Sequence, residues 1–527
     1  MSANPEQVLS DLMLYCASND IKVHTSIGAQ KVAGAGLGVY SARKIKSGER
    51  IVHVPTKHIF TTENIPEHFL PKASRQDLAV HAQLAAFFAF GGKNDLHEYE
   101  AWMAAWPELQ DFTAGMPIFW DFQAAHICTQ LRKEVLNMDA ETHKVKGTSK
   151  RRKVSNDSGG QSRRTFRKTM TKPPSRPFSL SPALSGSYSK TTDVPNNTSM
   201  LSKMSDKLIS HIRGINTALP HLNLVGDDQQ LTKFLHAWCL VNTRCFYFFQ
   251  PTAIVPPNGK RKIKPKPPAD PNEAMALCPF MDLFNHTAPP PELSTTPANG
   301  TEILPCKVKC DAKGFTVTTQ SSIPADTEIL LSYGAHTNDI LWSEYGFLLS
   351  SDTNSSDSIL LDEIILNSPA LKPVDKTVLE EHGYLGDYTL HNDGTLCYRT
   401  EMAAWLVVLG RQKWAKVISE GRDPEAECTS PFGKGQYSGC RMAFVSRVVE
   451  AAEDNIKGLQ RLNDKKLMEY FGTMIVVLNV HPESDEEHLA SAKSRRDMCT
   501  MRWQQIKSMA ERGIKILRAE IEEARED

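Results

Sequence analysis

Strand-type sequence occurs in two places that lie far apart in the chain, and helical periods fill much of the sequence between them. Residues 51–60 and 315–331 contain short β-branched runs bounded by glycine and proline, which is typical of strands and turns. Residues 77–89 instead place apolar side chains on one stripe with the period of a buried helix, and this period returns at 208–219 and 231–241. The sequence therefore predicts a β-rich part that is interrupted by helices.

The sequence after about residue 350 is mostly helical. Two apolar faces repeat there at helical spacing. The first face consists of Val445, Val449, Ala452, Ile456 and Leu459, and the second of Trp503, Ile506, Ala510, Leu517, Ile521 and Ala524. A helical second half therefore follows the β-rich part.

Composition limits the class of protein. Lys plus Arg and Asp plus Glu both number 61, so the net charge is zero and a wholly basic nucleic-acid coat is excluded. No long apolar window and no signal-peptide pattern occur, so we expect no membrane association and a location in the cytoplasm, the nucleus or both. The 11 cysteines are scattered, and the pair Cys306 and Cys310 lacks further ligands nearby, which favours strand cysteines over zinc and predicts no metal.

Residues 142–199 are rich in serine and threonine, are interrupted by prolines, and contain few apolar residues. This composition predicts a disordered segment, because it offers too little apolar surface for a core. Its basic block, Lys150-Arg151-Arg152-Lys153, has two interpretations. The block contacts an import receptor or nucleic acid, or it belongs to a solvated loop without a partner.

A glycine-rich run, Gly34-Ala35-Gly36-Leu37-Gly38, permits a ligand to approach the backbone closely. The run lacks the preceding strand, the following helix and the later acidic residue of a dinucleotide-binding fold. Without further context, the default interpretation is the turn of a β-hairpin.

Three further motifs follow the glycine run in a fixed order. They are Asn242-Thr243-Arg244-Cys245-Phe246 at a helix end, Asp282-Leu283-Phe284-Asn285-His286, and Ser332-Tyr333-Gly334 followed by Glu344-Tyr345-Gly346-Phe347. The ordered set resembles the SET-domain methyltransferases. Within that family it is similar to the subgroup of the plant Rubisco large-subunit lysine methyltransferase and the fungal ribosomal-protein lysine methyltransferases. Each motif alone is weak, whereas the four in order are specific.

The resemblance implies an α+β fold. Residues 21–350 would form a β-rich SET catalytic domain with small sheets and a pseudoknot-like threading near Asn285-His286 and Tyr333. A helical insertion would span about residues 70–245 and include the disordered segment. Residues 351–527 would form a mostly helical domain, similar in kind to the substrate-binding domain of the subgroup. The absence of flanking cysteine-rich zinc regions favours a non-histone substrate.

The resemblance also implies S-adenosylmethionine as the cofactor. The backbone at Ala35, Gly36 and Leu37 would hold it, and Arg244 would lie beside its carboxylate. Asn285 and His286 would fix its amino end and its adenine. Ala35 replaces a glutamate that is familiar in relatives, a change that a backbone contact tolerates.

Two of the motif residues keep a second interpretation. His286 has the alternative of a core histidine whose hydrogen bonds are satisfied. Asp282 is either structural or contacts the substrate.

The reaction implied by the resemblance requires a neutral lysine amine, held about 3–3.5 Å from the methyl carbon. A dry aromatic channel disfavours the ammonium form. We expect Tyr345 and Phe347 to surround the amine. Tyr333, which would border the cofactor as well, would orient the reacting nitrogen through its hydroxyl and stabilise the methyl group in transit. Tyr333 and Tyr345 are thus the expected catalytic residues, and the alternative for Tyr333 is a tyrosine packed at a strand end with its hydroxyl in solvent.

These implications predict a protein-lysine N-methyltransferase whose substrate is a ribosomal or other translation-related protein. Two alternatives remain open. One is a histidine methyltransferase of the same fold, although Tyr345 resembles the lysine-directed relatives. The other is an idle SET-fold scaffold that binds RNA or protein through its basic insert, although Tyr333, Arg244 and Asn285-His286 are all present.

Overall fold

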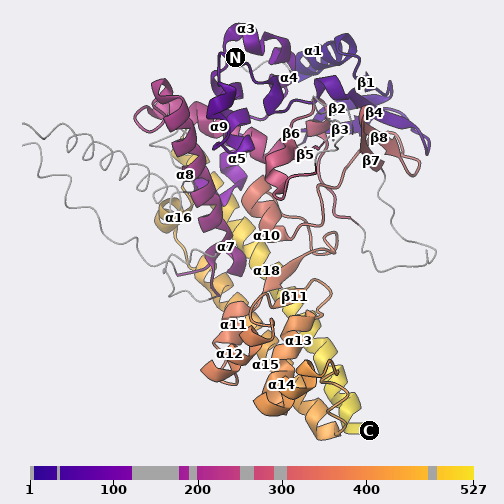
Figure 1. The fold of residues 1–527 in the computed structure, drawn as a ribbon, viewed down its shortest axis with the longest axis vertical. Helices are drawn as coiled ribbons and strands as arrows, with labels where there is room; N and C mark the ends of the chain where they lie inside the picture. The colour runs from indigo at the N-terminus through magenta and orange to yellow at the C-terminus, as the bar shows by residue number, and fades with distance from the viewer. Residues whose placement is uncertain are drawn as a thin grey trace, which may run out of the picture.

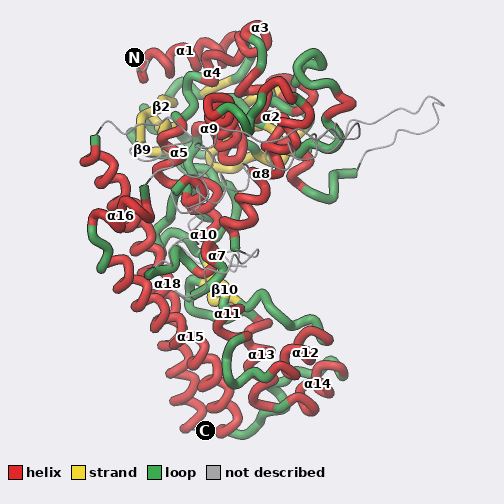
Figure 2. The backbone as a smooth tube through the Cα atoms, turned by 90° about the vertical axis from the view of Figure 1, so that its left-hand side faces the viewer, coloured by secondary structure: helices red, strands yellow, loops and turns green. Residues whose placement is uncertain are grey.

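The computed structural model describes residues 5–32, 36–120, 177–188, 199–249, 266–289, 306–472 and 484–526. The molecule is elongated, with the N-terminus at one end and the C-terminus at the other (Figure 1). Small sheets and helices together form the N-terminal end, and the C-terminal end is helical (Figure 2). In the described part of the chain, every helix is too short or too polar to span a lipid bilayer.

Two small antiparallel sheets carry the β-rich part. One has the strand order β1-β4-β8-β7 and the other β2-β3-β9. Their strands are β1 (Lys22–Val23), β2 (Ile27–Val32), β3 (Gly36–Ser41), β4 (Arg50–Pro55), β7 (Cys306–Asp311), β8 (Gly314–Thr319) and β9 (Thr327–Glu328). Of the strands expected within 51–60 and 315–331, those at 51–55 and 315–319 are confirmed and pair with each other in the first sheet, whereas residues 329–331 lie outside the strands. A third pair, β5 (Phe246–Tyr247) with β6 (Met275–Ala276), completes this part.

The glycine run lies at the hairpin between β2 and β3. The register pairs Ile27 with Ser41 and Val32 with Gly36, so β2 and β3 are antiparallel neighbours, and the residues between them, 33–35, lie outside the described residues. The hairpin interpretation is thus confirmed, while Ala35 itself lies outside the described residues. β3 also pairs with β9, because Tyr40 lies opposite Glu328. This contact brings the glycine run and the residues before Tyr333 into one sheet.

Three helices of the expected insertion pack together, with the first of them in contact with both of the others. They are α2 (Val80–Phe90), α8 (Met200–Ala218) and α9 (Asp228–Arg244). Helices α8 and α9 begin where Ser199 and Asp227 accept hydrogen bonds from backbone N–H groups of the first turn. The helices expected at 77–89, 208–219 and 231–241 are confirmed. Further helices are α1 (Pro5–Ser18), α3 (Lys93–Leu96), α4 (Glu100–Met103), α5 (Leu109–Gly115) and α10 (Asn338–Ile340).

The helical second half is confirmed, with one difference. Its frame is the antiparallel pair of α15 (Pro431–Gln460) and α18 (Asp485–Glu526), which runs along the long axis of the molecule (Figures 1 and 2). Around the pair lie α11 (Asp362–Leu366), α12 (Pro373–Glu381), α13 (Tyr398–Leu409), α14 (Arg411–Ser419) and α16 (Asp464–Phe471). The sequence did not indicate the short antiparallel pair of β10 (Ser358–Leu360) and β11 (Thr389–His391), because three-residue strands show no measurable period.

The prediction of disorder across 142–199 is wrong for residues 177–188. These residues form a folded segment with one helical turn, α7 (Pro182–Ser185), whose first turn is capped by the Ser181 hydroxyl. Phe178, Leu180 and Tyr188 are buried. The Trp503 indole donates to the Ser179 carbonyl at 2.6 Å, which ties the segment to α18. Most of the remaining residues of 142–199, including the basic block, lie outside the described residues.

Candidate active site

Four side chains from two of the motifs meet in one aromatic cluster. The ring of Tyr333 lies 4.9 Å from that of His286 and 5.3 Å from that of Tyr345, measured between centroids. Phe347 completes the cluster at 6.2 Å from both His286 and Tyr345. The cluster forms because His286 and Leu331 are paired in a parallel β-bridge. In this bridge the Leu331 N–H donates to the Asn285 carbonyl. The structure therefore brings together residues that are up to 61 positions apart in the sequence, from His286 to Phe347.

The Tyr333 hydroxyl points into the protein. It donates a hydrogen bond to the Phe284 carbonyl at 2.6 Å, which rules out the alternative of a hydroxyl left to solvent. Burial raises the pKa of Tyr333 to about 12. The phenol is therefore neutral at physiological pH, and its oxygen presents lone pairs next to a carbonyl oxygen. Two such oxygens attract a group that carries partial positive charge.

His286 is held in one orientation by the backbone. Its Nδ1 accepts a hydrogen bond from the Tyr333 N–H at 3.0 Å, so the neutral ring carries its proton on Nε2. Nε2 is buried and has no hydrogen-bond partner among the described residues. Burial and the nearby His336 lower the pKa of His286 to about 4. The ring is thus a neutral donor whose capacity the protein itself leaves unused, which disfavours the alternative of a satisfied core histidine.

Arg244 and Asp282 form a second polar group beside the cluster. Arg244, the last residue of α9, donates from Nη1 to the Asp282 carbonyl and lies 3.9 Å from the Asp282 carboxylate. The carboxylate accepts hydrogen bonds from the indoles of Trp102 and Trp106 at 2.9 and 3.0 Å. Its side chain is 1% exposed, and burial raises the pKa of its carboxyl above the usual range. Of the two roles that the sequence left open for Asp282, this enclosure favours the structural one.

Arg244 retains unused hydrogen-bonding capacity. Its Nε is buried without a partner among the residues that the structure describes. Asn285, three residues after Asp282, donates from Nδ2 to the Glu328 carboxylate at 2.7 Å. Glu328 also pairs with Tyr40 in the β3–β9 register, so Asn285 is fixed to the hairpin strand that follows the glycine run. Leu37 lies half-buried on that strand, which begins at Gly36.

Tyr345 ends an unusual helical turn. Residues Leu341–Tyr345 form a π-helix, and Gly346 follows with φ +84, a conformation that favours glycine. A Cβ on Gly115 would lie 2.1 Å from the Gly346 carbonyl oxygen, so α5 approaches this turn as closely as a glycine permits. Burial raises the pKa of Tyr345 above its usual range. The tyrosine is thus neutral and its backbone is enclosed.

Several residues of the site were not singled out from the sequence. Trp102 and Trp106 lie outside the four motifs, and no local signal indicated that their indoles bind Asp282. Glu328 lies four residues before Ser332, outside the motifs, and it bonds to Asn285 from β9, which pairs with β3. The cysteines expected on a strand, Cys306 and Cys310, lie on β7. Among the described residues, no group of three or more His, Cys, Asp or Glu residues could hold a metal ion.

Similar proteins were found by sequence and by structure. The chain is 29% identical to Ribosomal lysine N-methyltransferase 2 of Saccharomyces cerevisiae over 205 residues, which cover 37% of this chain and 38% of that protein. It is 29% identical to Ribosomal lysine N-methyltransferase set11 of Schizosaccharomyces pombe over 183 residues, which cover 33% and 39%. The chain thus spans about two-fifths of the length of these curated relatives. No protein-family model matches it.

The structural comparison concerns the fold. The structure of Rubisco LSMT bound to AdoMet aligns with a TM-score of 0.50 and 14% identity, covering 97% of this chain and 93% of that one. By sequence, the chain is also 29% identical to SET domain-containing protein 4 of Mus musculus over 191 residues, which cover 35% of this chain and 38% of that protein. The chain has the SET-domain fold. Small antiparallel sheets and a helical C-terminal region are the features of the SET fold that the sequence predicted and that the structure confirms.

Proposed function

We propose that this SET-domain chain is a protein-lysine N-methyltransferase that uses S-adenosylmethionine and acts on a non-histone protein, namely a ribosomal protein. The observation that carries the proposal is the Tyr333 hydroxyl, held at 2.6 Å from the Phe284 carbonyl inside a cluster of aromatic rings. The names of the two fungal relatives support lysine in a ribosomal protein as the acceptor.

The polar atoms beside the cluster fit the proposed cofactor. His286 Nε2 and Arg244 Nε are buried without partners in the described part of the chain, which is costly unless a ligand supplies acceptors. A cofactor carboxylate would satisfy Arg244, and an adenine nitrogen would satisfy His286. The remainder of the cofactor would be enclosed by the hairpin backbone at Ala35, Gly36 and Leu37 and by Asn285. When bound, S-adenosylmethionine supplies an activated methyl group.

The cluster would select the neutral form of the substrate amine. Lysine is about 3 pH units too basic at physiological pH, and its neutral form costs about 4 kcal/mol in water. Burial among Tyr333, Tyr345 and Phe347 disfavours the ammonium ion and lowers that cost. Both tyrosines are themselves neutral, since burial raises the pKa of each. Neither phenol would therefore remove the proton from the amine at physiological pH.

Tyr333 would act by position and charge distribution. Its proton is committed to the Phe284 carbonyl, so its oxygen lone pairs are available to orient the substrate nitrogen. The phenol oxygen and the carbonyl oxygen together would stabilise positive charge on the group in transit. Tyr345 would limit the space around the amine, and with it the number of methyl groups added.

The basic block Lys150-Arg151-Arg152-Lys153 remains a hypothesis for contact with an import receptor or nucleic acid. A ribosomal substrate agrees with a location in the cytoplasm, the nucleus or both. The catalytic-domain boundaries 21–350 and the helical domain 351–527 likewise remain proposals. In that division the helical domain would help to bind the protein substrate.

The direct test is transfer of a labelled methyl group. The purified full chain is incubated with labelled S-adenosylmethionine and ribosomal proteins from cells that lack the chain, with ribosomal proteins from parental cells as the matched control. We expect label on a lysine of one protein from the deficient cells and little on the control, whose site is already methylated. Label on histidine would contradict the lysine assignment. Absence of any incorporation, with no binding of the cofactor, would overturn the proposed function.

A further inference from the structure

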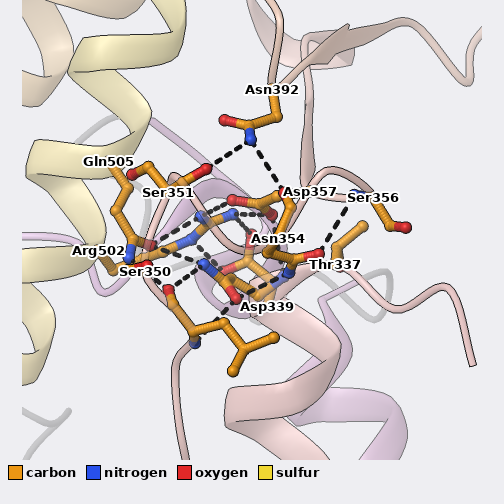
Figure 3. Close-up of polar contacts among 12 residues, drawn as sticks. Thr337, Asp339, Ser350, Ser351, Asn354, Ser356, Asp357, Asn392, Arg502 and Gln505 are labelled. Carbon is orange, nitrogen blue, oxygen red and sulfur yellow. Dashed lines mark hydrogen bonds and ion pairs between the residues drawn. The ribbon is translucent and has the colours of Figure 1, made fainter. Parts of the chain in front are cut away.

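A buried charged cluster joins the last helix to the segment that carries Tyr345. Arg502 of α18 is fully buried and forms ion pairs with Asp339 at 2.7 Å and with Asp357 at 2.6 Å. Both carboxylates are at most 2% exposed. Figure 3 shows the guanidinium between the two carboxylates, with Gln505 from the next turn of α18 beside it. Their attraction raises the pKa of Arg502 further above its usual range, so the charge is permanent.

Beside the charged cluster, hydrogen bonds join the two ends of the segment that contains Tyr345 and Phe347. Asn338 donates from Nδ2 to the Leu349 carbonyl and to the Gln505 side chain, both at 2.9 Å. The Leu349 N–H donates back to Asn338 Oδ1 at 3.2 Å, and Gln505 Nε2 donates to the Leu349 carbonyl at 2.8 Å. Residues 338 and 349 are therefore bound to each other and to α18. The two aromatic residues of the site lie on the chain between them.

A cluster of this kind is expensive to bury. Charges removed from water lose solvation, and an apolar replacement of similar volume is often equally stable. Fold stability alone therefore gives a weak reason for three buried charges at this position. A defined geometry gives a stronger one, because a guanidinium fork accepts only a narrow range of carboxylate positions.

We propose that Arg502 and Gln505 are positioning residues, through which α18 fixes Tyr345 and Phe347 in the aromatic cluster of the site. This inference rests on the proposed function for its effect on turnover. Among the described residues, no hydrogen bond joins Arg502 or Gln505 to the aromatic cluster. Arg502 instead binds Asp339 in α10, directly before Leu341–Tyr345, and Gln505 binds the Leu349 carbonyl. The helical domain is then a structural component of the amine channel.

The test compares two variants of the cluster with a control on the same helix. Gln505→Leu removes the neutral contacts without leaving a charge unpaired, and Asp339→Asn weakens one ion pair while keeping the side-chain shape. The control is Glu520→Gln, which weakens a partly buried pair with Arg441 between α18 and α15, 18 residues from Arg502. Hydrogen exchange over residues 341–349, melting temperature, cofactor affinity, kcat and KM are measured on the full chain.

We expect amide exchange over residues 341–349 to accelerate about tenfold in both cluster variants and to stay parental in the control. In an active enzyme, kcat should fall about tenfold while cofactor affinity stays within about twofold, because only the alignment of the amine is lost. Parental exchange and parental kcat in Gln505→Leu would overturn the inference, even if Asp339→Asn failed to fold. If the parental protein methylates nothing, the proposed function fails, and the exchange data alone decide whether α18 orders the segment.

Discussion

Arg244 interacts with Asp282 in two ways and keeps one donor group unused. It donates to the Asp282 carbonyl, faces the Asp282 carboxylate and keeps a buried Nε without a partner among the described residues. Arg244 therefore has two functions in this account: it neutralises a buried carboxylate and it presents a donor to a cofactor. Removal of the side chain should affect stability and binding together.

The prediction at this site compares Arg244→Ala with Asn285→Ala. Loss of a hydrogen bond to a charged group costs about 1.5–3 kcal/mol, so cofactor affinity should fall about tenfold or more in each variant. The melting temperature should fall further for Arg244→Ala, because Asp282 would keep a buried charge with only the two indole donors. Calorimetric titration and thermal unfolding measure the two effects. Unchanged affinity in both variants would contradict the cofactor assignment.

At the residue scale, the sequence predicted contacts among the motif residues better than contacts with residues outside the motifs. Tyr333, Tyr345, Phe347 and His286 meet as expected, because each stands in a motif whose spacing follows from one fold. The role of Asp282 could not be decided, since its partners Trp102 and Trp106 lie about 180 residues away in the sequence. Such contacts depend on the tertiary fold, which a local pattern does not contain.

The folded segment 177–188 is an element whose local signals are weak but real. Ser181 and Pro182 start one helical turn, and Gly186 ends it in the left-handed conformation. Beyond the turn, stability comes from contacts with distant helices: the Ser179 N–H donates to Asn455 on α15, and the Trp503 indole on α18 donates to the Ser179 carbonyl. The serine-rich composition predicted disorder because composition gives no information on contacts with distant helices.

Phe178→Ala tests the folded state of this segment. Phe178 is 2% exposed and stacks on Phe471 with a centroid distance of 5.2 Å. Truncation of such a ring should lower the free energy of unfolding by about 3–5 kcal/mol. The matched control is Phe432→Ala, at a phenylalanine that is 76% exposed, which should change it by less than about 0.5 kcal/mol. Equal effects in denaturant titrations of the two variants would show that the segment is not docked.

At the element scale, length and capping decided what could be predicted. Long helices such as α8, α9, α15 and α18 have sustained apolar faces or capping residues, and the sequence indicated each of them. The pair β10 and β11 and the π-helix were missed because three to five residues carry no period. The π-helix lies at Tyr345, where a local irregularity places a residue of the proposed site.

At the scale of the whole molecule, buried titratable groups make the stability of the fold depend on pH. In the helical insertion, His81 of α2 and His211 of α8 are buried with their rings 6.3 Å apart, and the Trp238 indole donates to His211 at 3.0 Å. Burial lowers the pKa of His81 to about 3 and that of His211 to about 4. In the native state, both histidines are thus neutral at any moderate pH.

This pair predicts loss of stability in mild acid. The unfolded chain binds protons at these histidines below a pH of about 6.5, whereas the folded chain does not until about pH 3–4. Stability therefore decreases as the pH falls below 6.5, by about 1 kcal/mol for each histidine at pH 5.5. Denaturant titrations between pH 7.5 and 5 measure the slope, and His211→Gln, which keeps an acceptor for Trp238, should reduce it. A pH-independent stability in the parental protein would contradict this account.

The most direct test of the account is the rate of a single methyl transfer by Tyr333→Phe. The substitution keeps the aromatic ring and removes only the hydroxyl that bonds to the Phe284 carbonyl. The cofactor and a lysine acceptor are supplied at concentrations well above their dissociation constants. Under these conditions we predict that the variant transfers the methyl group about 10²-fold or more slowly than the parental protein. Cofactor affinity and melting temperature should stay near the parental values. A variant with parental affinity that transfers the methyl group at the parental rate would contradict the role of Tyr333, and with it the proposed mechanism.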